Sequence, residues 1–376
     1  MIVIAGAGIG GLTLGCALSR SGREFRIFER AAELRPVGAG IALSANAFQA
    51  LAYIGLEERV RSCGCELAVA DLCELSGRVL LSTRLGDLGP GGTVAMTRTG
   101  LQQALLAALG TAVETGRCIV GYKSAPDGVR VRLADGEELD ADLLVGADGL
   151  HSAVRRAMRG DERPRYSGQT SWRGLVTSVR LPREDRVIES WGPGQRFGIV
   201  PVGPMQVYWF AVANAPAGQR DGADAISELR HRFAGWHAPI DELLAATPAG
   251  AIIRTDIVDR LPIDSWVDGR TVLLGDAAHP MTPNLGMGAC QAIEDAVLLA
   301  DALTREANID AALAHYQARR IPRANSFVVR SFRFGQVAHV QAPALRWVRN
   351  RALSIVRMVP GRLLSLAARR DFTFRL

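Results

Sequence analysis

The chain has 376 residues, of which 48% are apolar and 22% are charged, and its formal net charge is +6. These values are those of a folded protein long enough for two domains, and they exclude a disordered chain. Lys123 is the only lysine, and the arginines are scattered rather than gathered with aromatics on one basic face, so nucleic acid is not an expected partner.

The N-terminal segment has the pattern of a βαβ unit. Ile2–Ala5 is predicted to form an apolar strand, residues 12–20 a helix, and residues 24–29 an alternating second strand. The first strand and the helix are joined by a glycine-rich turn, Gly6-Ala7-Gly8-Ile9-Gly10-Gly11.

This glycine turn predicts a dinucleotide site. Gly6 permits the tight turn, Gly8 lets a pyrophosphate approach the backbone, and Gly11 lets the helix pack close to the strand. Glu29 ends the second strand and Arg30 follows it, so we expect this pair near the adenosine ribose, where the Glu29 carboxylate would repel a 2′-phosphate. By itself the turn does not separate FAD from NAD, and a glycine turn without a ligand is the alternative.

The rest of the chain alternates between helical and sheet-rich patterns. The predicted elements are a helix at Arg98–Leu109, a hairpin at 129–139, a buried strand at Leu143–Gly146, strands at 171–179, 187–191, 196–201 and 206–213, a strand at 271–274, and a long helix from about 286 to 304. The four strands between 171 and 213 are expected to be joined by tight turns in a mostly antiparallel sheet. Beyond them the chain is predicted to be helical.

Two further motifs combine acidic residues with glycine. They are Asp142-Leu143-Leu144-Val145-Gly146-Ala147-Asp148-Gly149 and Thr271-Val272-Leu273-Leu274-Gly275-Asp276-Ala277-Ala278-His279-Pro280, the second continuing through Pro283, Gly286 and Gly288 to Glu294-Asp295. With the first glycine turn, these residues resemble the single-component flavoprotein aromatic hydroxylases, which include p-hydroxybenzoate hydroxylase, and the resemblance runs nearly from end to end. It is nearest to the urate- and salicylate-hydroxylase members. The resemblance implies FAD, because an NAD dehydrogenase would have no use for the second and third motifs.

The implied fold is α/β: a Rossmann-like FAD-binding domain, an inserted and mostly antiparallel β-sheet domain for the substrate, and a helical C-terminus. We assign residues 1–70, 97–165 and 265–308 to the FAD-binding domain. Residues 71–96 and 166–264 are assigned to the substrate domain, and residues 309–376 to the C-terminal helical segment.

The resemblance also implies roles around the flavin. Asp276 follows a buried strand, where it could accept a hydrogen bond from the ribityl chain. The Gly286-Met287-Gly288 turn starts a helix whose positive N-terminal dipole would stabilise the anionic reduced flavin. The other matches are Pro283 near the reactive flavin carbon, Asp148 with Gly149 at the pyrophosphates of FAD and NAD(P)H, and Arg98 with Gln102, one helical turn apart, at the flavin phosphate and ribityl chain.

The sequence departs from the family at two positions of the third motif. Met287 stands where the family often has a polar residue, and Cys290 stands where asparagine is common; Cys290 is expected in the core. His279 is expected to be a structural part of its loop. Lys123 is expected in a coil, which makes it a poor candidate for the catalytic lysine of the halogenase branch.

By resemblance, NAD(P)H reduces the flavin, O2 forms a C4a-hydroperoxide, and its distal oxygen passes to an aromatic or polyketide-like molecule. The protein then orients the substrate and excludes water, so we name no catalytic acid or base. A similar arginine and tyrosine hold the substrate in FAD-dependent urate hydroxylases, which makes Arg196 and Tyr208 candidates to bind an anionic substrate. Phe210 shares the face of Tyr208 by the two-residue period, and Trp172 and Arg173 are further candidates; a packed sheet core is the alternative.

We expect a cytoplasmic enzyme without a metal site. No signal-peptide pattern is present, the six cysteines lack zinc-ligand spacing, and the uncharged stretches 37–56 and 197–219 are interrupted by glycine or proline. A membrane span would need about 20 continuous apolar residues. The arginines from Arg346 to Arg370, Arg362 among them, favour a solvated face of helices packed on the body, with a weak membrane-surface contact as the alternative.

Several properties stay open at this point. The expected partners are a small-molecule substrate and O2, with NADH or NADPH as the transient electron donor and a monomer or homodimer as the assembly. Two other functions compete with hydroxylation, namely epoxidation of a polyene or lipid and a flavin-holding partner protein without oxygenase turnover.

Overall fold

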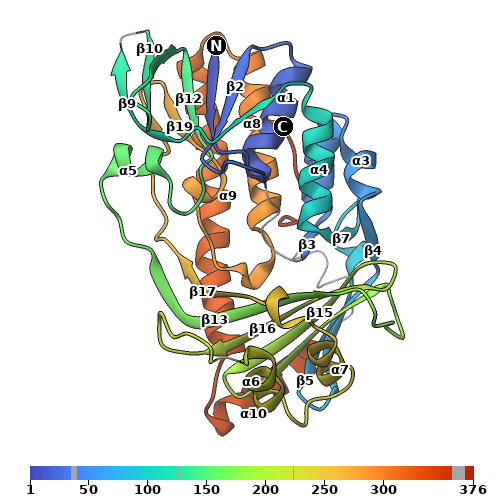
Figure 1. The fold of residues 1–376 in the computed structure, drawn as a ribbon. Coiled ribbons are helices and arrows are strands. Elements are labelled where there is room, and N and C mark those ends of the chain that lie inside the picture. The colour runs from blue at the N-terminus through green and yellow to red at the C-terminus, as the bar shows by residue number, and fades with distance from the viewer. Residues whose placement is uncertain (35–39, 126, 223, 358–368) are drawn as a thin grey trace.

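A six-stranded sheet forms the centre of the upper part of the molecule in Figure 1, a computed structural model that describes residues 1–34, 40–125, 127–222, 224–357 and 369–376. Its order is β18-β19-β12-β1-β2-β8, and all neighbouring pairs are parallel except β18 with β19. The strands are β1 (Ile2–Ala5), β2 (Phe25–Glu29), β8 (Val113–Thr115), β12 (Leu143–Gly146), β18 (Val267–Asp268) and β19 (Thr271–Leu273). β1, β12 and β19 are buried along their whole length, as expected of parallel strands covered on both faces.

Helices pack beside this sheet. α1 (Ile9–Arg20) packs against α8 (Gly288–Arg305) and α4 (Arg98–Leu109), and α8 also packs against α9 (Ile309–Ala338). The predicted helix at Arg98–Leu109 is confirmed, whereas α1 begins three residues before the predicted start because the glycine turn leads directly into it. α8 begins at Gly288 rather than 286, since Gly286 has a left-handed φ of +65°.

The predicted hairpin is part of a three-stranded antiparallel sheet next to β12. Its strands are β9 (Ile119–Ala125), β10 (Gly128–Leu133) and β11 (Glu138–Ala141), and α5 (Ala153–Arg159) packs against β9. Lys123 lies on β9 opposite Arg130, with its side chain exposed, so the predicted coil at Lys123 is wrong. This half of β9 is exposed, and the apolar alternation that would mark a strand is therefore weak there.

A seven-stranded sheet lies below the first sheet in Figure 1, with the order β17-β13-β16-β15-β14-β5-β6. The strands are β5 (Val69–Glu74), β6 (Val79–Arg84), β13 (Arg165–Val176), β14 (Arg186–Gly192), β15 (Gln195–Gly203), β16 (Gln206–Asn214) and β17 (Ile253–Asp259). Only β14 and β5 pair in parallel, so the mostly antiparallel character is confirmed. The predicted tight turn between β13 and β14 is wrong, because β16 and β15 lie between these strands in the sheet.

A small sheet of order β3-β7-β4 packs against β15 of the seven-stranded sheet and was not predicted. Its strands are β3 (Gly40–Leu43), β4 (Gly64–Leu67) and β7 (Thr93–Thr97). β7 therefore lies outside the seven-stranded sheet, although residues 71–96 were assigned to the substrate domain, and β5 begins at Val69. Sheet membership thus differs from the predicted limits by a few residues, and the division into domains stays a prediction.

Shorter helices complete the described part of the chain. They are α2 (Ala45–Tyr53), α3 (Glu57–Arg61), α6 (Ala225–Arg232), α7 (Ile240–Ala245) and α10 (Pro343–Val356), with 3₁₀ turns at Leu85–Asp87, Ala249–Ala251, Gly275–Ala277 and Pro283–Leu285. α6 and α7 cover one face of the seven-stranded sheet, where Leu229, Phe233 and Leu243 pack in one core with Phe197 and Trp209. None of the helices within the described ranges is long and apolar enough to cross a membrane.

Candidate functional site

The first glycine turn separates glycines that pack from a glycine that faces open space. A Cβ at Gly6, whose φ is +102°, would overlap Ala147, and a Cβ at Gly11 would overlap the Gly6 carbonyl oxygen. Around Gly8, by contrast, no atom of the described residues would lie within 4 Å of a Cβ. Gly8 is also the N-cap of α1, so free backbone N–H groups and the positive end of the helix dipole border this open space.

Glu29 lies beside this turn at the end of β2. Its carboxylate accepts hydrogen bonds from the backbone N–H groups of Ala7 and Ala31, each at 2.9 Å. These two bonds hold the acid next to the open side of Gly8, while Arg30 is exposed one residue further on. Contact of Glu29 and Arg30 with a nucleotide stays a prediction.

The second motif ends in a turn that starts α5. Asp148 Oδ2 accepts hydrogen bonds from the N–H groups of Ala153 (2.7 Å) and Val154 (3.3 Å), so the carboxylate caps this helix. Burial raises the pKa of Asp148, and these hydrogen bonds lower it. Gly149 has a φ of +79° and, like Gly8, no described atom within 4 Å of a Cβ. The cap is a structural role of Asp148 that the resemblance did not imply, and Gly149 alone adds to the open crevice.

The third motif places Asp276 opposite Arg98. Asp276 lies in the 3₁₀ turn after β19, and its Oδ1 would be 4.0 Å from a Cβ at Gly288, the first residue of α8. Both side chains have exposed surface, yet burial raises the pKa of Asp276 and lowers the pKa of Arg98, and each opposes that shift in the other. Exposed charges that are nonetheless desolvated lie inside an open cleft. Gln102 is half-buried one turn further along α4.

The loop before α8 lies next to Asp276 and borders the same open space. Pro283 begins a 3₁₀ turn that ends at Gly286, where no described atom would lie within 4 Å of a Cβ. Met287 is only 3% exposed, so the side chain that departs from the family packs into the core rather than into the cleft. Cys290 is fully buried as expected, and burial raises the pKa of its thiol to about 12.

These features fit an extended dinucleotide such as FAD. Open space lies beside three glycines in loops. Gly8 lies in the turn after β1, Gly149 in the turn after β12, and Gly286 in the loop between β19 and α8. The N-termini of α1 and α8 supply N–H groups and positive dipole ends for a diphosphate and for a reduced flavin, respectively. Arg98 and Asp276 lie where a cofactor that reaches from the N-terminus of α1 to the N-terminus of α8 would pass. Ligands bind at this edge of parallel sheets because the carboxyl ends of the strands meet there.

A cationic and aromatic cluster faces this cleft from the seven-stranded sheet. Arg196 is 2% exposed; its Nη1 donates to Glu189 (3.1 Å), its Nη2 donates to Asn284 Oδ1, and its guanidinium lies 5.8 Å from the Phe210 ring centroid. Asn284 follows Pro283, so Arg196 joins the sheet to the loop before α8. Sequence reasoning missed Asn284, since nothing in its spacing links it to a residue 88 positions away.

Tyr208 lies in the middle of the cluster. Its ring centroid is 6.0 Å from that of Phe210, which confirms their shared face. Burial raises the pKa of Tyr208, and three cations, Arg173, Arg196 and Arg98, lower it. Arg98 comes from α4 and the other two from the sheet, so the cluster and the cofactor cleft meet at this tyrosine.

Trp172 does not belong to this cluster. It pairs with Ala211 in the sheet, whereas Arg173 pairs with Phe210, so Trp172 points to the opposite face by the alternation of strand side chains. There its indole N–H donates to Asp221 at 2.8 Å, within the core under α6 and α7. Trp172 is therefore corrected from a substrate-site candidate to a core residue, while Arg173 stays a candidate.

Comparison with known proteins identifies the family. The family model described as "FAD binding domain" matches residues 1–331. The chain belongs to this family. It is 48% identical to the aurachin C monooxygenase/isomerase of Stigmatella aurantiaca, over 99% of this chain and 98% of that protein. It is 35% identical to the 2-heptyl-3-hydroxy-4(1H)-quinolone synthase of Pseudomonas aeruginosa, over 96% and 94%.

A solved structure agrees with these relatives. Klebsiella pneumoniae HpxO, complexed with FAD and uric acid, superposes with a TM-score of 0.91 at 30% identity, over 99% of this chain and 96% of that chain. The chain is therefore an FAD-dependent monooxygenase of the aromatic hydroxylase type, with the fold that the resemblance implied. FAD is its cofactor, and NAD(P)H is the electron donor typical of the family.

In this family FAD, when bound, takes electrons from NAD(P)H and activates O2 for transfer to the substrate. The chain's own residues have the remaining tasks. The glycine turns and the two helix N-termini would hold the cofactor, and the buried faces of the two sheets would exclude water. The arginine–tyrosine cluster is suited to orient a substrate.

A buried ion-pair network lies behind the cleft. Asp295 of α8 accepts hydrogen bonds from His279 Nε2 (2.6 Å), the Gly275 N–H (2.9 Å) and Arg320 Nε (2.6 Å). Burial alone would raise the pKa of Asp295, yet His279 and Arg320 hold it at about 2. Because Gly275 and His279 flank Asp276, the network fixes the turn that presents Asp276. His279 is thus a structural loop residue in this structure.

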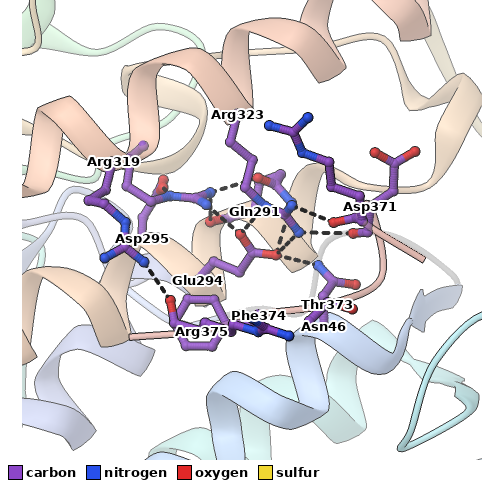
Figure 2. A network of polar contacts seen from close by, with 12 residues as sticks. Asn46, Gln291, Glu294, Asp295, Arg319, Arg323, Asp371, Thr373, Phe374 and Arg375 are labelled. Carbon is purple, nitrogen blue, oxygen red and sulfur yellow. Dashed lines mark hydrogen bonds and ion pairs between the residues drawn. The ribbon is translucent and has the colours of Figure 1, made fainter. Parts of the chain in front are cut away.

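Glu294, the neighbour of Asp295, joins the same network (Figure 2). Its carboxylate accepts hydrogen bonds from Asn46 (2.6 Å), Arg323 (2.8 Å) and Arg320. Sequence reasoning missed this network. The signal was present, since two adjacent acids flanked by apolar residues in a helix can be buried only with cationic partners.

The segment from residue 369 to residue 376 packs against this network. Arg323 donates to the Asp371 carbonyl oxygen at 2.9 Å (Figure 2). The Phe374 N–H donates to Gln49 of α2 at 2.9 Å, and the Phe374 ring meets Tyr53 edge-on at 5.8 Å. Phe374 is 6% exposed and belongs to the core of the six-stranded sheet. These residues are thus part of the cofactor half of the molecule.

Proposed function

We propose that this monooxygenase hydroxylates a ring carbon of a 4-quinolone that carries an apolar side chain. The observation that carries the proposal is the cluster around Tyr208, where Arg98, Arg173 and Arg196 converge on one aromatic face beside the cofactor cleft. The proposal is also supported by the name of the 2-heptyl-3-hydroxy-4(1H)-quinolone synthase, whose product has a ring hydroxyl next to an alkyl chain.

The cluster suits the chemistry of such a ring. Loss of the quinolone N–H proton places negative charge on the carbonyl oxygen and raises electron density at the adjacent ring carbon. A cation near that oxygen favours the anionic form, because an opposite charge within hydrogen-bonding distance lowers the pKa of an acid. Arg196 is suited to bind the oxygen, since its guanidinium is buried and has only Glu189 as an ionic partner among the described residues.

The surroundings of the cluster suit the rest of the molecule. Tyr208 and Phe210 supply an aromatic face for a planar ring. Apolar residues of the same cluster of contacts, Leu175, Val200 and Val202, extend this surface for an alkyl chain. Burial raises the pKa of Tyr208, so its hydroxyl keeps its proton at neutral pH and can donate to an anionic oxygen.

The test is a substrate screen for accelerated NAD(P)H oxidation by the FAD-loaded enzyme, with mass spectrometry of the product. The probes are 2-heptyl-4(1H)-quinolone, uric acid and 3-amino-4-hydroxybenzoate. We expect acceleration and a product heavier by one oxygen with the quinolone. Acceleration by uric acid or the benzoate alone would overturn the quinolone assignment, and an epoxide in place of a ring hydroxyl would support the polyene or lipid alternative.

Variants of two arginines on opposite faces of the sheet test the cluster. Arg196→Gln is expected to lower kcat/KM by roughly tenfold to a hundredfold, since a hydrogen bond to a charged group contributes about 1.5–3 kcal/mol. Arg254→Gln is the matched control, because Arg254 pairs with Asp221 beside Trp172 on the opposite face. Unchanged acceleration and substrate affinity in Arg196→Gln would refute the role of the cluster.

We further infer a cytoplasmic location. The cysteines are Cys16, Cys63, Cys65, Cys73, Cys118 and Cys290, and all are free thiols in the structure. Reduced thiols and an NAD(P)H supply are both properties of the cytosol. Labelling of intact cells with a membrane-impermeant thiol reagent should leave Cys63 and Cys118 unmodified.

A further inference from the structure

Helix α10 exposes mainly apolar side chains to solvent. Two of its polar side chains, Arg349 and Asn350, face the body of the protein. Arg349 is 8% exposed, donates to the carbonyl oxygens of Val337 (3.3 Å) and Ala338 (2.8 Å), and lies 4.9 Å from the Trp191 ring centroid. Asn350 donates to Glu74 at 2.8 Å. The arginine-rich segment was expected to show a solvated face of helices packed on the body; Arg351 and Arg357 are exposed as expected, whereas Arg349 is buried. Arg362 lies outside the described residues.

The outward face of α10 is apolar. Leu345, Val348 and Ile355 are 59%, 55% and 55% exposed, and Trp347 is 69% exposed. The positions 345, 348, 352 and 355 follow the helical period and form one stripe, with Ala352 as its fourth member. A surface helix in contact with water normally turns its polar face to solvent. The stripe therefore indicates a contact with another apolar surface.

The charges that α10 itself carries are all positive, and Glu74 of β5 lies beside the helix. No aspartate or glutamate occurs in the sequence between Asp310 and Asp371. Arg351 is exposed at the edge of the stripe, and Arg357, at the end of the helix, is exposed and donates to the Val79 carbonyl oxygen. A surface that covers the stripe therefore meets only positive charges from α10.

We propose that the outward face of α10 docks on the surface of an anionic lipid bilayer. Leucine, valine and isoleucine side chains fit the acyl boundary, and an exposed tryptophan fits the interface between acyl chains and headgroups. Arginines at the edge of the stripe reach lipid phosphates, at about 1 kcal/mol for each cation near an anionic surface. This inference goes beyond the proposed function and does not depend on the identity of the substrate.

The same charges disfavour a second copy of the chain as the cover. Pairing of two α10 helices about a twofold axis would bring equivalent surfaces together, so Arg351 and Arg357 would face a helix equally rich in arginine that carries no acid of its own. Docking also leaves the cofactor cleft free. In Figure 1, α10 lies at the lower end of the molecule, and the seven-stranded sheet separates it from the six-stranded sheet.

The test is co-sedimentation of the full-length, FAD-loaded protein with lipid vesicles. We expect binding to vesicles of phosphatidylglycerol and phosphatidylcholine, weak binding to phosphatidylcholine alone, and release by salt. The double variant Leu345→Ser/Val348→Ser should bind at least about tenfold more weakly, a loss of about 1.4 kcal/mol. Arg351→Gln should lower binding only to the vesicles that contain phosphatidylglycerol.

Leu261→Ser is the matched control, because Leu261 is 64% exposed and lies outside α10. It should bind vesicles as the unaltered protein does, and all variants should keep the same rate of NAD(P)H oxidation in lipid-free solution. Absence of binding to the anionic vesicles, or equal binding by the double variant, would overturn the proposal. So would sedimentation velocity that shows the double variant dissociating a lipid-free dimer, since the stripe would then be a subunit interface.

Discussion

In the crevice along the six-stranded sheet, the space beside Gly8, Gly149 and Gly286 is open, whereas on the seven-stranded sheet Arg196 and Tyr208 are surrounded by side chains. The crevice is built from backbone groups, helix ends and glycines, and so it suits a ligand of constant shape. The cluster is built from long side chains with several charges, and so its specificity can change by substitution without loss of the cofactor. The two regions should therefore respond to mutation in different assays.

The support behind the crevice should give the largest effect. Asp295→Asn leaves Arg320 without one of its buried carboxylate partners, and the expected loss of unfolding free energy is about 3–5 kcal/mol. The pKa of Asp295 is about 2, so its stabilisation is complete above pH 4 and is lost as the pH falls towards 2. Urea unfolding at pH 7 and pH 3 checks both points. The difference between the two proteins should shrink at pH 3, and a constant difference would contradict the ionic origin.

The crevice itself is tested by Gly8→Val. The backbone at Gly8 is extended and its Cβ direction is open, so the protein should fold, but the new side chain should occupy the space of the diphosphate. We expect FAD affinity to fall by roughly a hundredfold, or about 3 kcal/mol, in a fluorescence titration of the cofactor-free protein. Gly86→Val is the control, since its surroundings are equally open within the described residues and it lies in a 3₁₀ turn away from the three motifs. Equal FAD affinity in the two variants would show that the open space beside Gly8 does not hold the cofactor.

The cluster should respond more weakly and in a different assay. Tyr208→Phe keeps the ring contact with Phe210 and removes one hydroxyl, so kcat/KM for the substrate should fall about threefold to tenfold, the value of one hydrogen bond. FAD affinity should not change. Tyr166→Phe is the control, because the Tyr166 hydroxyl donates to the Ala215 carbonyl oxygen away from the cluster. A loss of FAD affinity in Tyr208→Phe would show that the cofactor and substrate regions are not separable.

A separate prediction, in stability rather than activity, concerns His339, which lies next to the cluster. Burial, and to a smaller extent the charge of Arg196, lowers the pKa of His339 from 6.5 to about 3; the neutral ring donates from Nδ1 to the Gly335 carbonyl oxygen at 3.0 Å. The unfolded chain binds a proton below pH 6.5 and the folded chain does not, so stability falls as the pH drops from 6.5 to 3, by at most about 1.4 kcal/mol per pH unit. His339→Gln should flatten this slope between pH 7 and pH 5 in urea unfolding. His315→Gln, at an exposed histidine, should leave it unchanged.

The sequence predicted the crevice better than the cluster, for a physical reason. Gly8, Asp276 and Gly286 belong to motifs in which strand, turn and helix follow one another, so their positions relative to the sheet are set locally. Arg196 and Asn284 are 88 residues apart, and their hydrogen bond depends on the packing of two sheets. Face alternation was available for Trp172, yet only the register of β13 and β16 shows which face is which.

Helix α10 shows a second limit of sequence reasoning. An amphipathic pattern gives two faces but not the direction in which each is turned, and the usual assumption that arginine faces water fails for Arg349. For Glu294 and Asp295, likewise, the sequence does not show that the acidic side chains are buried. Their cationic partners, Arg320 and Arg323, stand on the next helix, about 25 to 29 positions further on.

The contact of Phe374 with Gln49 and Tyr53 has a consequence for the order of folding. The core around the six-stranded sheet contains both β1 and Phe374, so residues from nearly the whole chain must meet before that core is complete. Closure of such a long loop is entropically costly, and domains with many distant contacts fold slowly. During synthesis, part of the apolar surface of α2 therefore stays exposed until residues 371–376 have left the ribosome. We expect this half of the enzyme to be the one that depends on chaperones.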